Sequence, residues 1–269
     1  MYPFRYERPT DVAEAVGLLQ AHPQARPLSG GMTLVPTLKH RLARPSHLVD
    51  LTRLPGLRGV ELQDGVLRIG AATPHAQVAA SPVVGQAIPA LAELAGLIGD
   101  AQVRQRGTLG GSIANNDPAA DYPSAVLALG ATVVTDRRRI AADEFFTGMF
   151  STALQPGEIV TAVEFPLPLR AAYCKHRHPA SGYALVGVFV ADTPNERRVA
   201  VTGAAPCVFR WREAEAVRPS DARDPGADAL PPLSPEGLND DLAATPAYRA
   251  HLASLLLRRA LVQLRASAA

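Results

Sequence analysis

Apolar residues in the first fifty positions alternate between helical spacing and short uninterrupted runs. Asp11 and Glu14 form a capping-box-like start for a helix that ends near Pro23, with apolar positions at Val12, Ala15, Val16 and Leu19. A strand at residues 26–28, a helix at residues 34–42 and a strand at residues 47–51 follow. The pattern therefore predicts a compact βαβ unit in the first fifty residues.

In the rest of the chain, the pattern of apolar residues predicts mainly helices up to about residue 130 and mainly strands after it. Alanine- and leucine-rich stretches follow a strand at residues 66–69 and indicate helices at residues 73–80, 88–98 and 124–129. A polar loop dense in Asn, Asp and Pro fills residues 115–123. Strands are expected at residues 132–135, 159–165, 172–176, 183–190 and 198–203. A flexible connection at residues 213–240 and an amphipathic helix at residues 251–264 complete the expected elements.

Composition narrows the class of protein. With 269 residues, 47% of them hydrophobic, the chain can bury a full core in two or three subdomains. No apolar run approaches the length that crosses a bilayer, so we expect a cytoplasmic protein, or one held at the inner membrane through a partner. The net charge of +2 with interspersed signs makes nucleic acid an unexpected partner. Two cysteines, Cys174 and Cys207, cannot hold an iron–sulfur cluster, so any such cluster must lie on another chain.

Two glycine pairs carry the most informative chemistry. Each opens a turn that ends in a hydroxyl: Ser29-Gly30-Gly31-Met32-Thr33 and Thr108-Leu109-Gly110-Gly111-Ser112. At a strand-to-helix turn the free N–H groups of the first helical residues converge, and a side chain on either glycine would block a phosphate from reaching them. Together the turns predict a pyrophosphate site. The spacings of the P-loop and of the G-x-G-x-x-G fingerprint are both missing, which disfavours those two kinds of nucleotide site.

The second glycine turn lies in a longer stretch, Gly99 to Pro123, that closely resembles the flavin subunit of molybdenum hydroxylases. That family includes the medium subunits of aerobic carbon monoxide dehydrogenase and of bacterial xanthine dehydrogenases. The resemblance continues through the first glycine turn with Leu34 and Lys39, and through Pro156-Gly157-Glu158-Ile159-Val160. It covers nearly all of the first 210 residues.

This resemblance implies an α+β fold of the vanillyl-alcohol-oxidase (PCMH) type that binds FAD. Two FAD-binding subdomains, residues 1–55 (the βαβ unit) and residues 56–168, would cradle the cofactor. A C-terminal α/β domain of the carbon monoxide dehydrogenase flavoprotein type would occupy residues 169–269. The independent argument from helix termini points to the same pyrophosphate site.

The resemblance also implies which residues contact FAD. Those that match the pyrophosphate motifs are Ser29, Gly30, Gly31, Met32, Thr33, Thr108, Leu109, Gly110, Gly111 and Ser112. Asp121 matches a residue that hydrogen-bonds the flavin nucleotide, and Asp117 could do the same; a loop-capping role is the alternative for both. Lys175 matches a lysine near the flavin, where a cation could favour the anionic reduced ring, although a surface lysine is the other interpretation.

Three apolar or aromatic residues complete the implied site. Tyr183 resembles a tyrosine that lies over the isoalloxazine, and without the family it is simply a strand aromatic. Ile159 and Val160 would give apolar backbone contacts to the ring region, or are ordinary core strand residues. His176 and His178 lack a third ligand nearby, so no metal site is predicted, and no residue of this chain is singled out as catalytic.

The resemblance and the cysteine count together predict an electron-transfer flavoprotein subunit. A molybdenum-binding large subunit would oxidise the substrate, a small 2Fe-2S subunit would relay electrons, and FAD on this chain would pass them to an external acceptor. The implied assembly is a dimer of heterotrimers. One alternative is a self-contained FAD-dependent oxidoreductase of the same fold, and another is a cofactor-free binding module. The substrate of the complex and its acceptor, whether NAD, quinone, cytochrome or oxygen, stay open.

Overall fold

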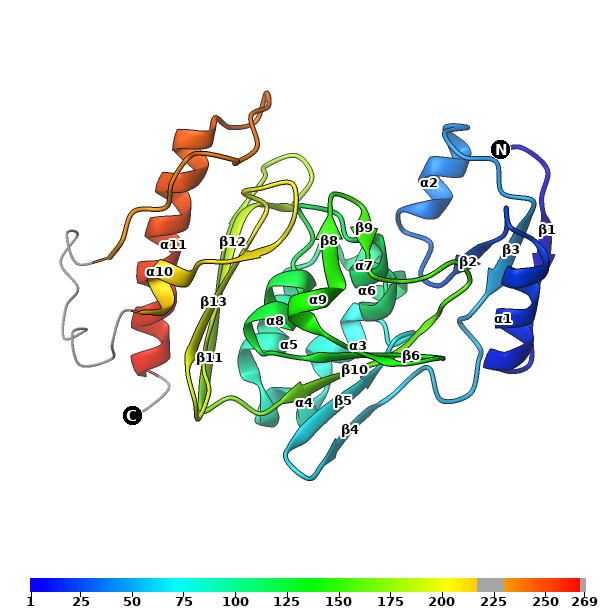
Figure 1. Ribbon diagram of the computed structural model, residues 1–269, viewed down its shortest axis with the longest axis horizontal. Helices are drawn as coiled ribbons and strands as arrows, with labels where there is room; N and C mark the ends of the chain where they lie inside the picture. Colours follow the sequence, from blue (N-terminus) through cyan, green and yellow to red (C-terminus); the bar gives the residue numbers. More distant parts are fainter. Residues whose placement is uncertain (217–229, 267–269) are drawn as a thin grey trace.

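The computed structural model describes residues 1–216 and 230–266, which contain three larger β-sheets and a two-stranded one. The first is a parallel sheet in the order β1-β3-β2, made of β1 (Arg5–Glu7), β2 (Arg26–Leu28) and β3 (His47–Asp50). Helix α1 (Val12–Ala21) packs on this sheet, and α2 (Leu34–Lys39) follows the first glycine turn. Figure 1 shows this unit in blue at one end of the molecule. The expected βαβ unit is confirmed.

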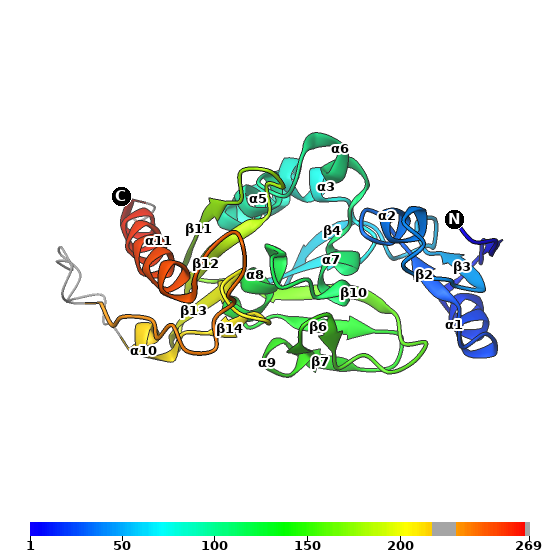
Figure 2. The same ribbon diagram turned by 90° about the horizontal axis from the view of Figure 1, so that it is seen from above.

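The second sheet is antiparallel and occupies the middle of the molecule. Its order is β4-β5-β10-β6-β7, with the strands β4 (Val60–Gln63), β5 (Val66–Gly70), β6 (Thr132–Thr135), β7 (Arg139–Ala141) and β10 (Val160–Pro166). Six short helices lie beside it: α3 (His75–Ala80), α4 (Pro82–Ala87), α5 (Pro89–Gly96), α6 (Ala101–Arg106), α7 (Leu109–Asn115) and α8 (Tyr122–Ala128). Seen from above, α3, α5 and α6 gather on the β4 side of the sheet (Figure 2).

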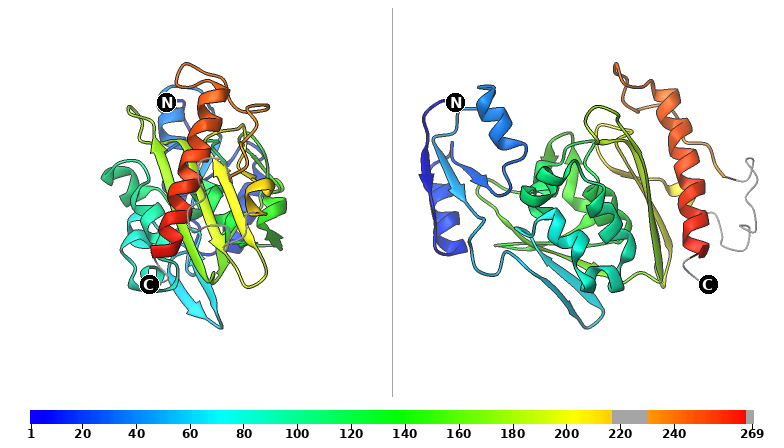
Figure 3. Two further views of the ribbon diagram at one scale, coloured as in Figure 1. Left: turned by 90° about the vertical axis from the view of Figure 1, so that its left-hand side faces the viewer. Right: turned by 180° about the vertical axis from the view of Figure 1, so that it is seen from behind.

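The third sheet is antiparallel and packs on both faces. It consists of β11 (Arg170–Arg177), β12 (Ala184–Asp192), β13 (Arg197–Thr202) and β14 (Phe209–Arg210). One face shares a hydrophobic core with α5, α8 and the middle sheet, and the other is covered by the long helix α11 (Pro246–Ala266). Figure 3 shows α11 lying across the outer face of this sheet. All nine residues of β12 are buried, as expected for a strand that is covered on both sides.

The longer predicted elements are confirmed, and their ends differ where a local signal decides. The second helix stops at Lys39 rather than residue 42, because Arg41 has a φ of +58° and the Leu42 amide donates to the Thr37 carbonyl. The terminal helix begins at Pro246 rather than residue 251, since proline is favoured at a first helical position.

Short elements were not predicted. These are β1, β4, β7 and β14, the helices α4 and α6, and three pieces between β7 and β10: α9 (Ala142–Phe145), β8 (Phe146–Gly148) and β9 (Ser151–Thr152). The expected flexible connection at residues 213–240 begins inside α10 (Arg212–Glu215), and its central part, residues 217–229, lies outside the described residues. The expected loop at residues 115–123 is shorter, because its ends belong to α7 and α8.

No helix of the described residues is long and apolar enough to span a bilayer.

Candidate functional site

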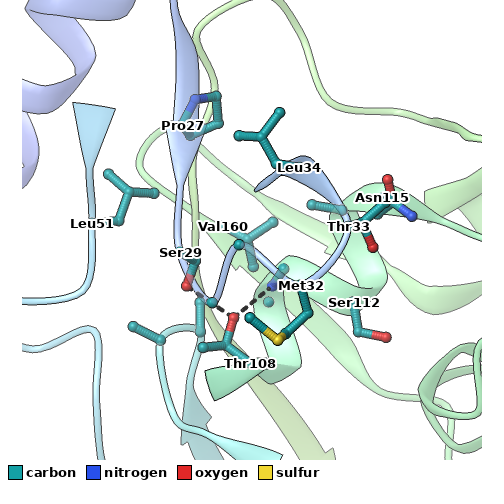
Figure 4. A pocket seen from close by; sticks show the side chains of 18 of the residues that line it. Pro27, Ser29, Met32, Thr33, Leu34, Leu51, Thr108, Ser112, Asn115 and Val160 are labelled. Atoms are coloured by element: carbon teal, nitrogen blue, oxygen red, sulfur yellow. Dashed lines mark hydrogen bonds between the residues drawn. The ribbon is translucent and has the colours of Figure 1, made fainter. Parts of the chain in front are cut away.

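The two glycine segments lie against each other although they are far apart in the sequence. The Ser29 hydroxyl and the Thr108 hydroxyl are 2.9 Å apart, and Thr108 in turn accepts a hydrogen bond from the Gly111 amide at 3.2 Å. Figure 4 shows this chain of contacts where the turn after β2 meets the start of α7. Thr108 is thus the N-cap of α7, and this cap converts a Gly-Gly sequence that is typical of turns into the first turn of a helix.

A cavity of about 410 Å³ lies beside this contact, within the size range of ligand pockets. It is lined by every predicted site residue except Leu109 and Lys175. These lining residues are Ser29, Gly30, Gly31, Met32, Thr33, Thr108, Gly110, Gly111, Ser112, Asp117, Asp121, Ile159, Val160 and Tyr183. The fold therefore brings four separate sequence segments to one cavity. Met32, Ser112 and Val160 are seen around it in Figure 4.

The two glycine turns differ in the backbone donors they offer. Among the described residues, no carbonyl or side chain accepts a hydrogen bond from the amides of residues 29–33. At α7 every early amide is taken: Leu109 donates to Thr73, Gly110 to Ala71, and Gly111 to its own cap. The expectation of free amides therefore holds at the first turn only. The second turn offers hydroxyls, on Thr108 and Ser112, and an open surface at Gly111.

At three of the four positions, glycine is required by packing or by backbone conformation, which the sequence did not reveal. A Cβ on Gly30 would lie 2.2 Å from the Arg106 carbonyl oxygen, and a Cβ on Gly110 would lie 2.5 Å from the Ala71 Cβ. Gly31 has a φ of +72°, which side chains disfavour. At Gly111 a Cβ would lie 2.9 Å from the Thr108 hydroxyl oxygen, its next neighbour would be the Ser29 Cβ at 3.8 Å, and the residue is exposed at the cavity wall. The steric argument for phosphate access therefore applies to Gly111.

Asp121 is the charged residue most deeply set in the cavity wall. Its carboxylate accepts a hydrogen bond from the Tyr173 hydroxyl at 2.6 Å and pairs with the Lys175 ammonium group at 2.9 Å. Burial raises the pKa of Asp121 above its usual range, and the Lys175 charge opposes that shift. Burial likewise lowers the pKa of Lys175. Asp121 is therefore held by two partners from β11 and does not use its carboxylate to cap α8.

Lys175 and Leu109 lie outside the lining of the cavity. The Lys175 ammonium group is enclosed between Asp121 and the Leu97 carbonyl oxygen, which accepts a hydrogen bond at 3.1 Å. Its side chain is 1% exposed, so the alternative of a surface lysine is wrong. Leu109 is fully buried in the main hydrophobic core. Lys175 does not line the cavity itself and is linked to it only by its ion pair with Asp121.

Asp117 and Tyr183 lie at the more open side of the cavity. The Asp117 carboxylate accepts a hydrogen bond from the Ala119 amide at 2.9 Å, as the loop-capping interpretation predicts, and the residue also lines the cavity. Tyr183 precedes β12 and is 41% exposed. Partial burial and the nearby carboxylates raise the pKa of the Tyr183 hydroxyl. An exposed ring at a cavity mouth is available to cover a bound ligand.

Ile159 and Val160 line the cavity at the start of β10, and the buried carboxylate of the preceding residue, Glu158, holds this segment in place. The Glu158 carboxylate accepts hydrogen bonds from the Arg138 guanidinium at 2.9 Å and the Thr135 hydroxyl at 2.8 Å. These donors lower the pKa of Glu158 to about 2. The Ile159 amide donates to Asp136 at 2.6 Å. The start of β10 is thereby fastened to the turn between β6 and β7.

His75 lines the cavity and was not predicted. It is 4% exposed, and burial, with the nearby Arg104 charge, lowers its pKa to about 4. It is therefore neutral at ordinary pH, and its Nδ1 atom has no partner among the described residues. A Cβ on Gly107 would lie 2.6 Å from the His75 Nε2 atom, so this glycine makes room for the ring. The only signal for this packing in the sequence was Gly107, which directly precedes the Thr108 cap.

The chain is similar to the medium subunits of known dehydrogenases and hydroxylases along nearly its whole length. A family model described as the FAD binding domain in molybdopterin dehydrogenase matches residues 2–168. The carbon monoxide dehydrogenase medium chain of Hydrogenophaga pseudoflava is 35% identical over 277 residues, which cover 96% of each chain. The nicotine 6-hydroxylase medium subunit of Paenarthrobacter nicotinovorans is 34% identical over 278 residues, again 96% of each.

A solved structure gives the same relationship in three dimensions. The carbon monoxide dehydrogenase from Hydrogenophaga pseudoflava that lacks the Mo-pyranopterin moiety of the molybdenum cofactor aligns with a TM-score of 0.87. The two chains are 35% identical, and the alignment covers 99% of each. The similarity therefore includes the C-terminal sheet and α11, beyond the residues that the family model matches.

Proposed function

Since this chain belongs to the family of FAD-binding medium subunits of molybdenum hydroxylases, we propose that it binds FAD in the cavity described above and relays electrons. The electrons would come from a 2Fe-2S partner subunit and leave to an external acceptor. The observation that carries this proposal is the row of unpaired amides at residues 29–33 beside the cavity. Unpaired amides at a helix start are the donors that a pyrophosphate needs.

The residues present fit FAD in three further respects. Gly111 presents no side chain, and the Thr108 and Ser112 hydroxyls lie beside it as donors. Asp121 and Asp117 offer carboxylate oxygens, which suit sugar or ribityl hydroxyls. Ile159, Val160 and Tyr183 add apolar and aromatic lining to the cavity, which suits a flat ring system.

FAD supplies the redox chemistry when it is bound, and the chain supplies binding, orientation and electrostatics. The unpaired amides of residues 29–33 would donate hydrogen bonds to the pyrophosphate, and Arg26, which also lines the cavity, would add a positive charge nearby. Asp121 orients a hydroxyl of the cofactor, while its partner Lys175 balances its charge. Tyr183 controls access from solvent. We assign no residue of this chain to proton transfer on a substrate, because the substrate would be oxidised on the molybdenum subunit.

The fold and assembly follow from the same proposal. The first two units, residues 1–55 and 56–168, would form a PCMH-type FAD-binding domain, and residues 169–269 would form the C-terminal flavoprotein domain. A molybdenum-binding large subunit and an iron–sulfur small subunit would complete a heterotrimer, two copies of which associate. A partner that carries the clusters is required, because the two cysteines, Cys174 and Cys207, are too few to ligate one.

An absorption spectrum of the purified chain tests the cofactor first. We expect the two visible bands of an oxidised flavin, and FAD in the supernatant after heat release. The chain should then be co-expressed with the proposed molybdenum-binding and iron–sulfur partner subunits, and the mass of the purified complex should equal two copies of each chain.

Two results would contradict the proposal. A complex that contains all three chains but no flavin would overturn the cofactor assignment. A chain that oxidises a substrate alone, with no partner subunit, would favour the self-contained oxidoreductase instead. The cofactor-free binding module predicts a colourless protein that does not take up added FAD.

A further inference from the structure

Tyr173 reaches from the C-terminal sheet to the wall of the cavity without lining it. It is on β11, it is 4% exposed, and its ring lies beside that of Phe189 with centroids 6.0 Å apart. Its hydroxyl donates to the Asp121 carboxylate at 2.6 Å. Asp121 lies directly before α8 of the middle unit, and α8 packs against β12 and β13 of the same sheet as β11 (Figure 1). One hydrogen bond therefore joins the C-terminal sheet to a residue of the candidate FAD site.

The Asp121 carboxylate is fixed by this contact together with the ion pair. Tyr173 and Lys175 are two positions apart on β11, so their side chains leave the same face of the strand. The Lys175 ammonium group lies 2.9 Å and 3.0 Å from the two Asp121 oxygens. A carboxylate has about four lone-pair sites, so at least one acceptor site remains for a ligand. The two partners determine where that site points.

Gly187 is the second, independent observation. It lies in the middle of β12, opposite Lys175, and its φ is not positive, so its backbone conformation does not call for glycine. Glycine in a strand interior is unfavourable and often marks a close approach. A Cβ at this position would lie 2.5 Å from the Tyr173 hydroxyl oxygen, 3.0 Å from the Thr202 Cγ2 and 3.2 Å from the Tyr173 Cε2, so the phenol is the nearest obstacle. The missing side chain is therefore the space through which the Tyr173 phenol reaches Asp121.

We infer that Tyr173 is a positioning residue of the FAD site, which acts on the cofactor through Asp121. Position 187 is then a glycine because a side chain there would displace the Tyr173 phenol. This inference rests on the proposed function, because it needs Asp121 to contact FAD. Tyr173 would orient the carboxylate, and Lys175 would compensate its charge.

The test uses the co-expressed holoenzyme and the variant Tyr173→Phe, which removes only the hydroxyl. The rate of FAD release after dilution is followed by the rise in flavin fluorescence. We expect release about tenfold faster than in the unsubstituted complex, with little change in melting temperature of the FAD-free protein. Tyr122→Phe is the matched control: Tyr122 is also fully buried and next to Asp121, but its hydroxyl has no partner among the described residues.

A double-mutant cycle separates positioning from general loosening. Asp121→Asn should itself accelerate release, and Tyr173→Phe should add nothing in that background. Gly187→Ala should behave like Tyr173→Phe, because its methyl group displaces the phenol, and the two changes together should be no worse than either alone. Gly187→Ala also serves if Tyr173→Phe does not fold.

Three outcomes would overturn the inference. The first is an unchanged release rate in Tyr173→Phe while Asp121→Asn accelerates it. The second is an equal acceleration by Tyr173→Phe in the Asp121→Asn background, which would be a purely structural effect. The third is normal release in Asp121→Asn, which removes Asp121 from the site although FAD is still bound. Failure of the proposed function is distinct, because the unsubstituted complex would then contain no FAD.

Discussion

Gly110 and Gly111 are neighbours, yet the structure gives them different reasons to be glycine. Gly110 is buried and packs against Ala71, whereas Gly111 is exposed to the cavity. From the sequence both were expected to clear a path for phosphate. The two roles predict opposite phenotypes, because one glycine stabilises the fold and the other leaves room for a ligand.

We expect Gly110→Ala to lower the free energy of unfolding by about 2 kcal/mol, since the added methyl group must displace Ala71 or the start of α7. Gly111→Leu should leave the free energy of unfolding of the FAD-free protein nearly unchanged and should abolish FAD retention. Urea denaturation and the flavin content of the purified variants measure the two effects.

Gly17→Ala is the control for the first variant. Gly17 lies in α1 and a Cβ there would meet nothing within 4 Å, so alanine should stabilise the protein by roughly 0.5–1 kcal/mol. A Gly110→Ala protein as stable as the unsubstituted chain would contradict the packing role. A Gly111→Leu protein that still carries a full complement of FAD would contradict the phosphate-access role.

For individual residues, the sequence identified most of those that line the cavity, but it did not reveal why each of these residues is needed at its position. Hydroxyls and glycines in two turns were recognisable because their chemistry is local. The positions of Leu109 and Lys175 were not, since which side of an element faces the cavity depends on tertiary packing. Tyr173 was missed because it reaches the cavity wall through Asp121, and His75 was missed because its place in the wall depends on packing against Gly107, which is distant in the sequence.

Among the elements, the start of β10 depends on a single buried carboxylate. Glu158 joins the β6–β7 turn to β10 through Thr135 and Arg138, and its side chain is fully buried. Because its pKa is lowered to about 2 from an ordinary value of 4.5, it adds stability at pH values above about 4.5. That contribution should decline as the pH falls from about 4.5 towards 2, where the carboxylate becomes protonated in both states.

Glu158→Gln should therefore lower the free energy of unfolding at pH 7 by about 2 kcal/mol, and the gap to the unsubstituted protein should narrow steadily below pH 4.5. Urea denaturation at pH 7, 4 and 3 measures this gap. Glu61→Gln, at an exposed position of the edge strand β4, is the control and should change stability little at any of these pH values. A gap that stays constant down to pH 3 would show that the Glu158 charge is not the stabilising feature.

Elements were predictable where local signals agree and not where tertiary contacts create them. The helices α1 and α5 carry a cap or a proline at their first turn, and both were expected. The strands β8 and β9 have two or three residues each and exist because they pair with each other. Helix α7 has Gly110 and Gly111 in its first turn, a pair that local propensity assigns to a turn, and the Thr108 cap together with burial against Ala71 overrides that propensity.

Considered as a whole, the molecule places its cavity where the first unit meets the middle unit. Turn residues 29–33 belong to the first unit, whereas Ala71, Ala72 and the start of α7 belong to the middle one. A small core that includes Leu51, Leu54, Ala72 and Ile159 also joins the two units. A ligand in this cavity would therefore add to the contact between them.

This placement predicts where FAD should change the dynamics of the complex. Helix α2 has six residues, of which only Leu38 is buried, and the turn that precedes it is held by few contacts, chiefly the Ser29–Thr108 hydrogen bond and the close approach of Gly30 to the Arg106 carbonyl. Hydrogen exchange followed by mass spectrometry should show faster exchange of residues 29–39, by tenfold or more, when FAD is removed, and recovery when FAD is restored. The amides of α11 should change less than twofold, because α11 lies at the opposite end of the molecule from the first unit (Figure 1). Equal acceleration in both regions would instead mean that the cofactor stabilises the entire fold, and unchanged exchange at residues 29–39 would remove the first glycine turn from the FAD site.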